Sequence, residues 1–313
     1  MSLEVKDLSV SYGEKTVLKN ISFQIEKGQI IGLVAPNGTG KTTLFNAMMR
    51  FIPTRSGQIL IDGTEYTASS KDVLELHQKM TFFPDQGDLL LNFSGREHIK
   101  MYADIWADSK QEVDAIIELL EMNGYVDRKV HTYSLGMKQR LCFAMMVAAN
   151  TPVMLMDEVM NGLDPENVAL VSSVLLKLKS EGKIIMVSSH LLDNLDEYAD
   201  KVFFLKEKIL HHITDWHEQM PIYYKTLLSP EKAKELEAKV LLPEETIHLG
   251  NNMLCIPIKD LDTEAQLKLF QEIRLLEPEE LSVGPMGTSE YYSYIYSLPV
   301  RVPDRREEYA VGS

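Results

Sequence analysis

A run of small and hydroxylated residues that ends in a lysine and two threonines has the composition of a phosphate-binding loop. The run spans residues 35–43, after an apolar stretch at 30–34 that is typical of a buried strand and at the start of a helical pattern over 41–49. In such a unit, backbone N–H groups and the positive end of the helix dipole face a polyphosphate. We expect Lys41 to reach the terminal phosphates and Thr42 to offer its hydroxyl to Mg²⁺. The predicted ATP-binding residues of the loop are Asn37, Gly38, Thr39, Gly40, Lys41, Thr42 and Thr43.

Two adjacent carboxylates follow a second apolar run, residues 153–156. Asp157 is expected to hold Mg²⁺ through its water shell. Glu158 is expected to act as the general base toward the attacking water, a role worth about 10²–10⁴ in rate. An Asp-Glu pair at a strand end is a weak signal alone, but downstream of a phosphate-binding loop the two pieces complete one site. The pattern therefore predicts ATP hydrolysis with ATP and Mg²⁺ as cofactors.

Further segments resemble a known family. Residues 133–140, Tyr-Ser-Leu-Gly-Met-Lys-Gln-Arg, resemble the signature motif of ATP-binding cassette (ABC) proteins, and residues 161–165, Asn-Gly-Leu-Asp-Pro, resemble the D-loop of that family. Ser189-His190 resembles its switch histidine, and Tyr12 falls where the family stacks an aromatic ring on adenine. These motifs keep the family's order over residues 1 to about 210. The sequence thus resembles the ATP-binding subunits of ABC transporters.

The resemblance implies an ATP site shared between two subunits. The signature residues lie at the start of a helix predicted over 136–148, where N–H groups and the helix dipole favour an anion. In the family that anion is the γ-phosphate of ATP held by the other member of a head-to-tail homodimer or heterodimer. His190 is expected to contact the γ-phosphate and to complete a catalytic set with Glu158 and Lys41, and Asp164 to belong to the D-loop. The predicted signature residues are Ser134, Leu135, Gly136 and Met137.

Residues 80–86 resemble the family's Q-loop, with two candidates for its functional residue. The position usually held by glutamine falls on Asp85, and Gln86 comes next. Either side chain could contact Mg²⁺ and water, and the sequence does not decide between them. An acidic residue here, together with the Ser-Leu-Gly-Met-Lys-Gln signature, resembles the bacterial branch of type-two exporters, including peptide-antibiotic resistance and immunity exporters. The apolar residues 89–93 fit equally well with the core of a helical subdomain or with a groove for a membrane subunit's coupling helix.

Two residues depart from the family pattern. Ala35 replaces the usual first glycine of the phosphate-binding loop, and Leu135 replaces a commoner glycine in the signature. A methyl group at residue 35 is expected to strain the turn and to weaken nucleotide binding slightly. These departures keep open the alternative of a weakly hydrolysing regulatory subunit. A second alternative, a soluble non-transport ABC ATPase acting on ribosomes or DNA, is disfavoured because the chain lacks a second cassette and a long coiled coil.

The order of apolar and helical segments predicts the fold that positions these residues. Strands at 30–34, 153–156 and 184–188 with a helix at 165–180 form βαβ units of a parallel sheet, while the alternating runs at 3–9 and 21–25 predict an antiparallel layer. The predicted fold is an α/β P-loop NTPase of the ABC cassette type, with a mixed sheet and a helical subdomain, followed by a small C-terminal α+β domain. The expected boundaries are 1–212 for the cassette, about 86–150 for its helical subdomain, 213–301 for the accessory domain, and 302–313 for a charged, disordered tail.

Composition limits the partners. The net charge is −14, and this acidic balance argues against nucleic acid, whose phosphates need clustered Lys and Arg. The longest apolar stretch, residues 141–149, is far shorter than the roughly 18 residues that read as a membrane span. We therefore expect a separate integral-membrane permease subunit as the partner. The expected location is peripheral, at the cytoplasmic face of the cell membrane.

Overall fold

The structure, a computed structural model, describes residues 1–106, 113–213 and 221–297. The chain divides into two compact units, Met1–Trp216 and His217–Ser313, and each is described by itself. The division falls slightly beyond the boundary expected at residue 212. The predicted tail at 302–313 lies outside the described residues.

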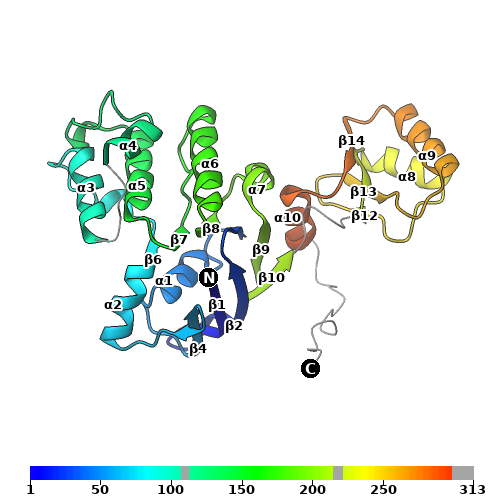
Figure 1. The fold of residues 1–313 in the computed structure, drawn as a ribbon. Coiled ribbons are helices and arrows are strands. Elements are labelled where there is room, and N and C mark those ends of the chain that lie inside the picture. The colour runs from blue at the N-terminus through cyan, green and yellow to red at the C-terminus, as the bar shows by residue number, and fades with distance from the viewer. Residues whose placement is uncertain (107–112, 214–220, 298–313) are drawn as a thin grey trace. The chain divides into compact units, whose positions relative to one another are not determined.

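A six-stranded sheet forms the centre of the first unit, with the strand order β10-β9-β3-β8-β7-β6 (Figure 1). Neighbouring strands pair in parallel, except for the antiparallel hairpin of β9 and β10. Every residue of β3, β7 and β8 is buried, as expected for central strands of a parallel sheet with both faces covered. The strands are β3 (Ile30–Val34), β6 (Met80–Phe82), β7 (Val153–Met156), β8 (Ile184–Ser188), β9 (Lys201–Lys206) and β10 (Ile209–Ile213).

A second, antiparallel sheet has the order β2-β1-β4-β5. Buried and exposed residues alternate along much of β2, so one face of this sheet packs on the core and the other faces solvent. The predicted antiparallel layer is confirmed, and its strands are longer than the alternating runs suggested. They are β1 (Ser2–Tyr12), β2 (Lys15–Glu26), β4 (Ser56–Ile61) and β5 (Thr64–Glu65).

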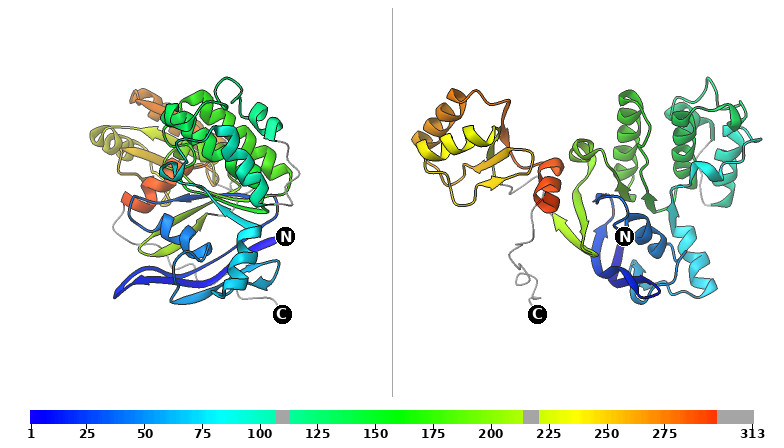
Figure 2. Two further views of the ribbon diagram at one scale, coloured as in Figure 1. Left: turned by 90° about the vertical axis from the view of Figure 1, so that its left-hand side faces the viewer. Right: turned by 180° about the vertical axis from the view of Figure 1, so that it is seen from behind.

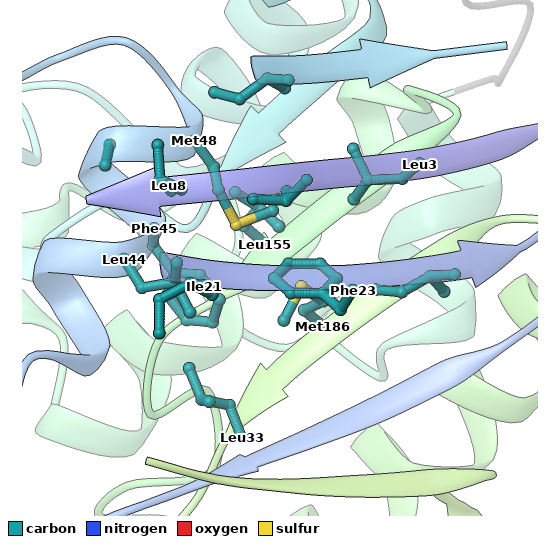
Figure 3. Close-up of a cluster of buried hydrophobic side chains, with 14 of the residues drawn as sticks. Leu3, Leu8, Ile21, Phe23, Leu33, Leu44, Phe45, Met48, Leu155 and Met186 are labelled. Carbon is teal, nitrogen blue, oxygen red and sulfur yellow. The ribbon is translucent and has the colours of Figure 1, made fainter. Parts of the chain in front are cut away.

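The main core lies between the two sheets. Helix α1 (Lys41–Met48) contributes Leu44, Phe45 and Met48 to this core, which also contains alternate residues of β7 and β8, such as Leu155 and Met186 (Figure 3). Helix α2 (Ser70–Lys79) lies on the same side of the six-stranded sheet, and α6 (Pro165–Ser180) and α7 (Leu192–Tyr198) cover its opposite face (Figures 1 and 2). Strand β3 and helix α1, which flank the phosphate-binding loop, are therefore both fixed in the packed core.

The helical subdomain is built from α3 (Gly95–Ile105), α4 (Val113–Leu119) and α5 (Leu135–Ala149), with single 3₁₀ turns at Gln86–Asp88 and Val130–Thr132. Helix α3 starts with a capping box in which Ser94 and Glu97 satisfy each other's backbone N–H groups. Helices α3 and α5 pack together, and α5 is buried almost all round from Leu141 to Ala149. These helices lie within the range of about 86–150 expected for the helical subdomain, and α3 ends at Ile105.

The second unit contains an antiparallel sheet with the order β12-β13-β11-β14. With its two intervening helices it has the β-α-β-β-α-β order of a split βαβ, ferredoxin-like unit. Helices α8 and α9 cover the sheet face of Tyr224 and Ile256, while Tyr291 and Tyr294 of α10 pack on the opposite face. The predicted C-terminal α+β domain is confirmed. Its elements are β11 (Tyr223–Leu227), α8 (Pro230–Lys239), β12 (Ile247–His248), β13 (Met253–Pro257), α9 (Thr263–Leu275), β14 (Glu280–Gly284) and α10 (Thr288–Ser297).

Each unit holds one buried free cysteine, Cys142 in α5 and Cys255 in β13. Burial raises the pKa of each thiol to about 12. No helix in the described parts of the chain is both long enough and apolar enough to cross a bilayer.

Candidate ATP-hydrolysis site

The segments predicted to do chemistry follow four neighbouring strands at one edge of the six-stranded sheet. The phosphate-binding loop follows β3, Ser189-His190 follows β8, Asp157-Glu158 follows β7, and Pro84-Asp85 lies just beyond β6. Since these four strands are adjacent and parallel, their carboxyl ends bring the segments together.

The phosphate-binding loop has the backbone conformation that its glycines allow. Gly38 and Gly40 have φ of 77° and 119°, in the left-handed region that side chains disfavour. A Cβ atom on Gly40 would also lie 3.1 Å from Val17 Cγ1 of β2. No side chain caps the start of α1, so its first N–H groups remain directed at the position of a bound anion.

Ala35 fits the loop without left-handed backbone. Its φ is not positive, and its methyl group is buried in the main core cluster. The strain expected from a methyl group at this position is therefore absent from the backbone, because the left-handed turns of the loop fall on Gly38 and Gly40 instead.

Lys41 is pre-positioned inside the loop. Only 6% of it is exposed, and its Nζ donates a hydrogen bond to the carbonyl oxygen of Ala35 at 2.7 Å. Burial lowers the pKa of Lys41 from its ordinary value, while the negative charges of Glu158 and Asp157 act in the opposite direction. The ammonium group therefore lies in a partly desolvated site, where its attraction for a phosphate is stronger than in water.

Asp157 connects the loop to strand β8. Its Oδ2 accepts a hydrogen bond from Thr42 Oγ1 at 2.6 Å, and its Oδ1 accepts one from the hydroxyl of Ser188. Ser188 is fully buried, and its Oγ also accepts a hydrogen bond from the backbone N–H of Glu158 at 2.9 Å. One serine on β8 thus aligns both carboxylate residues that follow β7.

Glu158 has both carboxylate oxygens engaged. Oε1 lies 2.7 Å from Nε2 of His190, and Oε2 accepts a hydrogen bond from Nδ2 of Asn161 at 2.9 Å. The backbone of Glu158 has φ of 52°, in the left-handed region that is uncommon for a non-glycine residue. The structure brings the two predicted catalytic residues Glu158 and His190 into contact.

The two Q-loop candidates make different contacts. Asp85 uses Oδ1 to accept the backbone N–H of Gly87 at 2.6 Å and so caps the 3₁₀ turn that follows it. Gln86 donates its side-chain amide to Oε1 of Gln139. Both residues line the same cavity as Thr42 and Asp157, yet neither is hydrogen-bonded to them.

The signature motif contacts the D-loop of its own chain. Ser134 caps α5 by accepting the N–H of Met137 at 3.3 Å, and Leu135 is 63% exposed. A Cβ atom on Gly162, whose φ is 74°, would come within 2.9 Å of Leu135 Cδ2. Gly136 faces the same segment at a longer distance, since a Cβ atom on it would lie 3.7 Å from the Gly162 carbonyl oxygen.

Asp164 caps α6. Its Oδ1 accepts the backbone N–H of Asn167 at 2.9 Å, and its Oδ2 accepts the side-chain amide of the same residue. These hydrogen bonds from Asn167 lower the pKa of Asp164. Asp164 therefore stabilises the start of α6, in addition to any role that it has in ATP hydrolysis.

Tyr12 lies apart from the carboxylates, at the end of β1. It pairs with Lys15 across the hairpin to β2, and 53% of it is exposed. The position leaves an aromatic face open to solvent, as a site for adenine stacking requires.

Three residues of the site were not assigned a role from the sequence. Ser188, Asn161 and Gln139 make the hydrogen bonds that hold Asp157 and Glu158. Only the position of Ser188 could have been inferred from the sequence, because this residue ends the strand next to β7 and must therefore lie beside the carboxylates. The partners of Asn161 and Gln139 depend on loop geometry that no spacing rule describes.

The oxygen atoms near Lys41 suit a magnesium ion bound together with nucleotide phosphates. Mg²⁺ prefers one or two protein carboxylates, a hydroxyl group and phosphate oxygens rather than an all-protein cage. Thr42 Oγ1 and Asp157 Oδ2 are already 2.6 Å apart. In the described parts of the chain no three His, Cys, Asp or Glu side chains gather as a metal site.

Comparisons with known proteins agree with this geometry. The family profile described as ABC transporter matches residues 18–161. The lantibiotic transport ATP-binding protein SrtF of Streptococcus pyogenes is 31% identical over 205 residues, which cover 66% of this chain and 87% of SrtF. The bacitracin transport ATP-binding protein BcrA of Enterococcus faecalis is 30% identical over 255 residues, covering 79% of this chain and 82% of BcrA.

Among solved structures, the dimeric ATP-binding cassette MJ0796, bound to ADP and Pi after hydrolysis, superposes with a TM-score of 0.61 at 20% identity. The match covers 68% of this chain and 98% of the cassette, so it shows the fold. The chain belongs to the ATP-binding proteins of ABC transporters. It binds ATP as a subunit of such a transporter and hydrolyses it.

Proposed function

We propose that the chain drives export through a separate integral-membrane permease subunit, as one of two ATP-binding subunits that close around two ATP molecules. The single observation that carries the proposal is the hydrogen-bonded group of Thr42, Asp157, Glu158 and His190 at one sheet edge, beside the buried ammonium of Lys41. It supplies a cation, an acidic pair and a histidine in one place, which is what phosphoryl transfer to water requires.

In the proposed reaction, Lys41 and the start of α1 hold the terminal phosphates, and Thr42 with Asp157 would hold Mg²⁺. The bound ion would neutralise charge that develops on the phosphate oxygens. Glu158 accepts the proton of the attacking water, and His190 contacts the γ-phosphate from the adjacent strand end. The short contact between Glu158 Oε1 and His190 Nε2 supports their joint action.

The proposed dimer uses the exposed start of α5. Ser134 and Leu135 are exposed there, and the first turn of the helix contains no acidic residue. An exposed helix N-terminus without negative charge favours an anion, and the γ-phosphate held by the second subunit is the proposed occupant. The dimeric state of the related cassette MJ0796 supports the same arrangement.

The proposed contact with the membrane subunit lies at one part of a cavity of about 950 Å³, which the Q-loop segment lines together with Thr42 and Asp157. In this part the ring of Phe51 meets those of Phe82 and His77 edge-on, and Phe51 is exposed. Of the apolar residues 89–93, Leu89 is buried, whereas Leu90, Leu91 and Phe93 are exposed. Exposed apolar surface of this kind favours the insertion of an apolar segment of a partner, here a short helix of the permease. The chain would then lie at the cytoplasmic face of the membrane.

The proposed cargo is an antibiotic. Two relatives, SrtF and BcrA, are named for the transport of a lantibiotic and of bacitracin, and the similarity to BcrA extends past the cassette into the second unit. The exporter signature and the acidic Q-loop position support the same direction of transport.

The test is to express the chain together with a candidate permease subunit in a sensitive bacterial host. We expect the pair to raise the inhibitory concentration of bacitracin or of a lantibiotic, and the Glu158→Gln variant to abolish the increase. Co-purification of the two proteins provides the partner assay. The proposal is wrong if the two chains do not associate, or if resistance is the same with Glu158→Gln.

A further inference from the structure

Gln139 is a buried polar residue that the proposed reaction does not use. It lies near the start of α5, with only 4% exposed. Its Nε2 donates to the carbonyl oxygens of Glu158 and Val159 at 2.9 and 2.8 Å, and its Oε1 accepts the side-chain amide of Gln86. One side chain therefore contacts both the Q-loop segment and the backbone of the proposed general base.

The direction of the Gln139 amide follows from its partners. The carbonyl oxygens of Glu158 and Val159 accept hydrogen bonds only, so the NH₂ group of Gln139 must face them. Its oxygen then faces residue 86, where a donor is needed. Gln86 supplies that donor, and an acidic side chain such as that of Asp85 could not.

The backbone of Glu158 depends on outside support. Its left-handed φ of 52° is unfavourable for a residue with a side chain and persists only where the surroundings hold it. Ser188 Oγ accepts its N–H on one side. On the other side its carbonyl oxygen accepts Gln139 Nε2 at 2.9 Å and the backbone N–H of Asn161 at 3.0 Å, and Gln139 is the side chain among these two donors. These contacts orient the peptide groups of Glu158 and hence the direction in which its carboxylate leaves the chain.

We propose that Gln139 is a positioning residue that sets the orientation of Glu158 and that Gln86 couples this orientation to the Q-loop segment. The inference rests on the proposed role of Glu158 as the general base. Because Gln86 lines the cavity proposed for the membrane subunit, a partner that moves this segment also moves the amide on which Gln139 depends. Gln86 would then act through Glu158 rather than as a ligand of Mg²⁺.

The experiment compares ATP hydrolysis by the complex of the full chain with its membrane subunit. Gln139→Glu keeps the shape but replaces the donor with an oxygen that faces two carbonyl oxygens, and Gln139→Met removes the amide altogether. We expect kcat to fall about 10- to 100-fold in both variants, as for a displaced catalytic group, with KM and ATP affinity unchanged. Gln24→Glu, an exposed residue of β2, adds the same charge and should leave kcat unchanged.

A double-mutant cycle tests the link to the Q-loop. Gln86→Leu should lower kcat, and the Gln86→Leu/Gln139→Met double variant should be no slower than Gln139→Met alone, because both changes break one chain of contacts. Additive losses, or a rise in KM with kcat unchanged, would overturn the inference.

If Glu158→Gln retains wild-type turnover, the proposed base itself fails. If Glu158→Gln is inactive while both Gln139 variants hydrolyse ATP normally, only the present inference fails.

Discussion

The carboxylate of Glu158 is held at both oxygens, by His190 Nε2 at 2.7 Å on Oε1 and by Asn161 Nδ2 at 2.9 Å on Oε2. Each carboxylate oxygen can accept a second hydrogen bond, so the attacking water can bind Glu158 without displacing either contact. His190 is the contact that we expect to change when ATP binds, because it would turn to the γ-phosphate.

Glu158→Gln should bind ATP and hydrolyse it about 10²–10⁴ times more slowly, since the amide cannot accept the proton of water. The ATP-bound dimer should then accumulate and be visible by light scattering after size exclusion. Glu181→Gln, an exposed acid just after α6, is the matched control and should hydrolyse normally. Near wild-type turnover of Glu158→Gln would remove this residue as the base.

Gly162→Ala should destabilise the first unit for two separable reasons. The alanine would adopt an unfavourable φ near 74°, at a cost of about 1–2 kcal/mol, and its Cβ would crowd Leu135. Gly162→Asn brings the same Cβ but tolerates left-handed backbone better, so it should cost less. Adding Leu135→Ala to Gly162→Ala should recover only the crowding part. The measurement is urea denaturation of each variant, and equal losses for Ala and Asn would contradict the backbone explanation.

Ala35→Gly restores the commoner family residue but should lower stability. The change removes a buried methyl group, worth about 0.8 kcal/mol, and adds chain entropy worth about 0.5–1 kcal/mol. ATP affinity should stay the same, because Lys41 contacts the backbone oxygen of residue 35. Thermal denaturation and nucleotide titration check the two parts. A more stable or tighter-binding variant would mean that the methyl group strains the loop after all.

Tyr12→Ala should raise the KM for ATP more than it lowers kcat. Stacking of a base on an aromatic ring is worth about 1–3 kcal/mol and tolerates other bases, so GTP should also support some hydrolysis. Tyr12→Phe keeps the ring and is the control. Steady-state kinetics with both nucleotides gives the answer, and an unchanged KM in Tyr12→Ala would assign adenine to another residue.

A cut after Trp216 should leave a first unit that folds and binds ATP. A cut after Glu207 removes β10, whose Leu210 is buried in the main core, and breaks the hydrogen bond from the Lys19 N–H to the Lys208 carbonyl oxygen. Loss of Leu210 burial alone costs about 1.5–3 kcal/mol. Circular dichroism and ATP binding of the two fragments provide the comparison. A folded fragment ending at Trp216 that cannot bind ATP would show that the division into units is wrong.

Much of the fold, and the strand ends at which the candidate site residues gather, could be predicted from the sequence, because each motif is contiguous. A glycine-rich loop between a strand and a helix, or two acids at a strand end, carries its structural context with it. Parallel strands then force these segments to one sheet edge, so the proximity of Thr42 to Asp157 follows from topology alone.

The contacts that depend on several distant segments could not be predicted. Gln86, Gln139 and Glu158 come from a turn, a helix and a loop, and their alignment depends on the packing of α5 on the sheet. For the same reason the sequence left Asp85 and Gln86 equivalent, although one caps a turn and the other reaches Gln139. The length of β1 and β2 was underestimated because irregular pairing interrupts their alternation.

The placement of one buried thiol in each unit gives the protein two internal reporters. At neutral pH a thiol with a pKa of about 12 is almost never a thiolate, and burial also keeps reagents away from it. Modification must therefore wait until the surrounding structure opens, when the pKa returns toward about 8.5. The chain has two cysteines, one in α5 and one in the C-terminal sheet. Peptide mapping of labelled Cys142 and Cys255 would therefore measure the rate at which each of these regions opens, separately and in one sample.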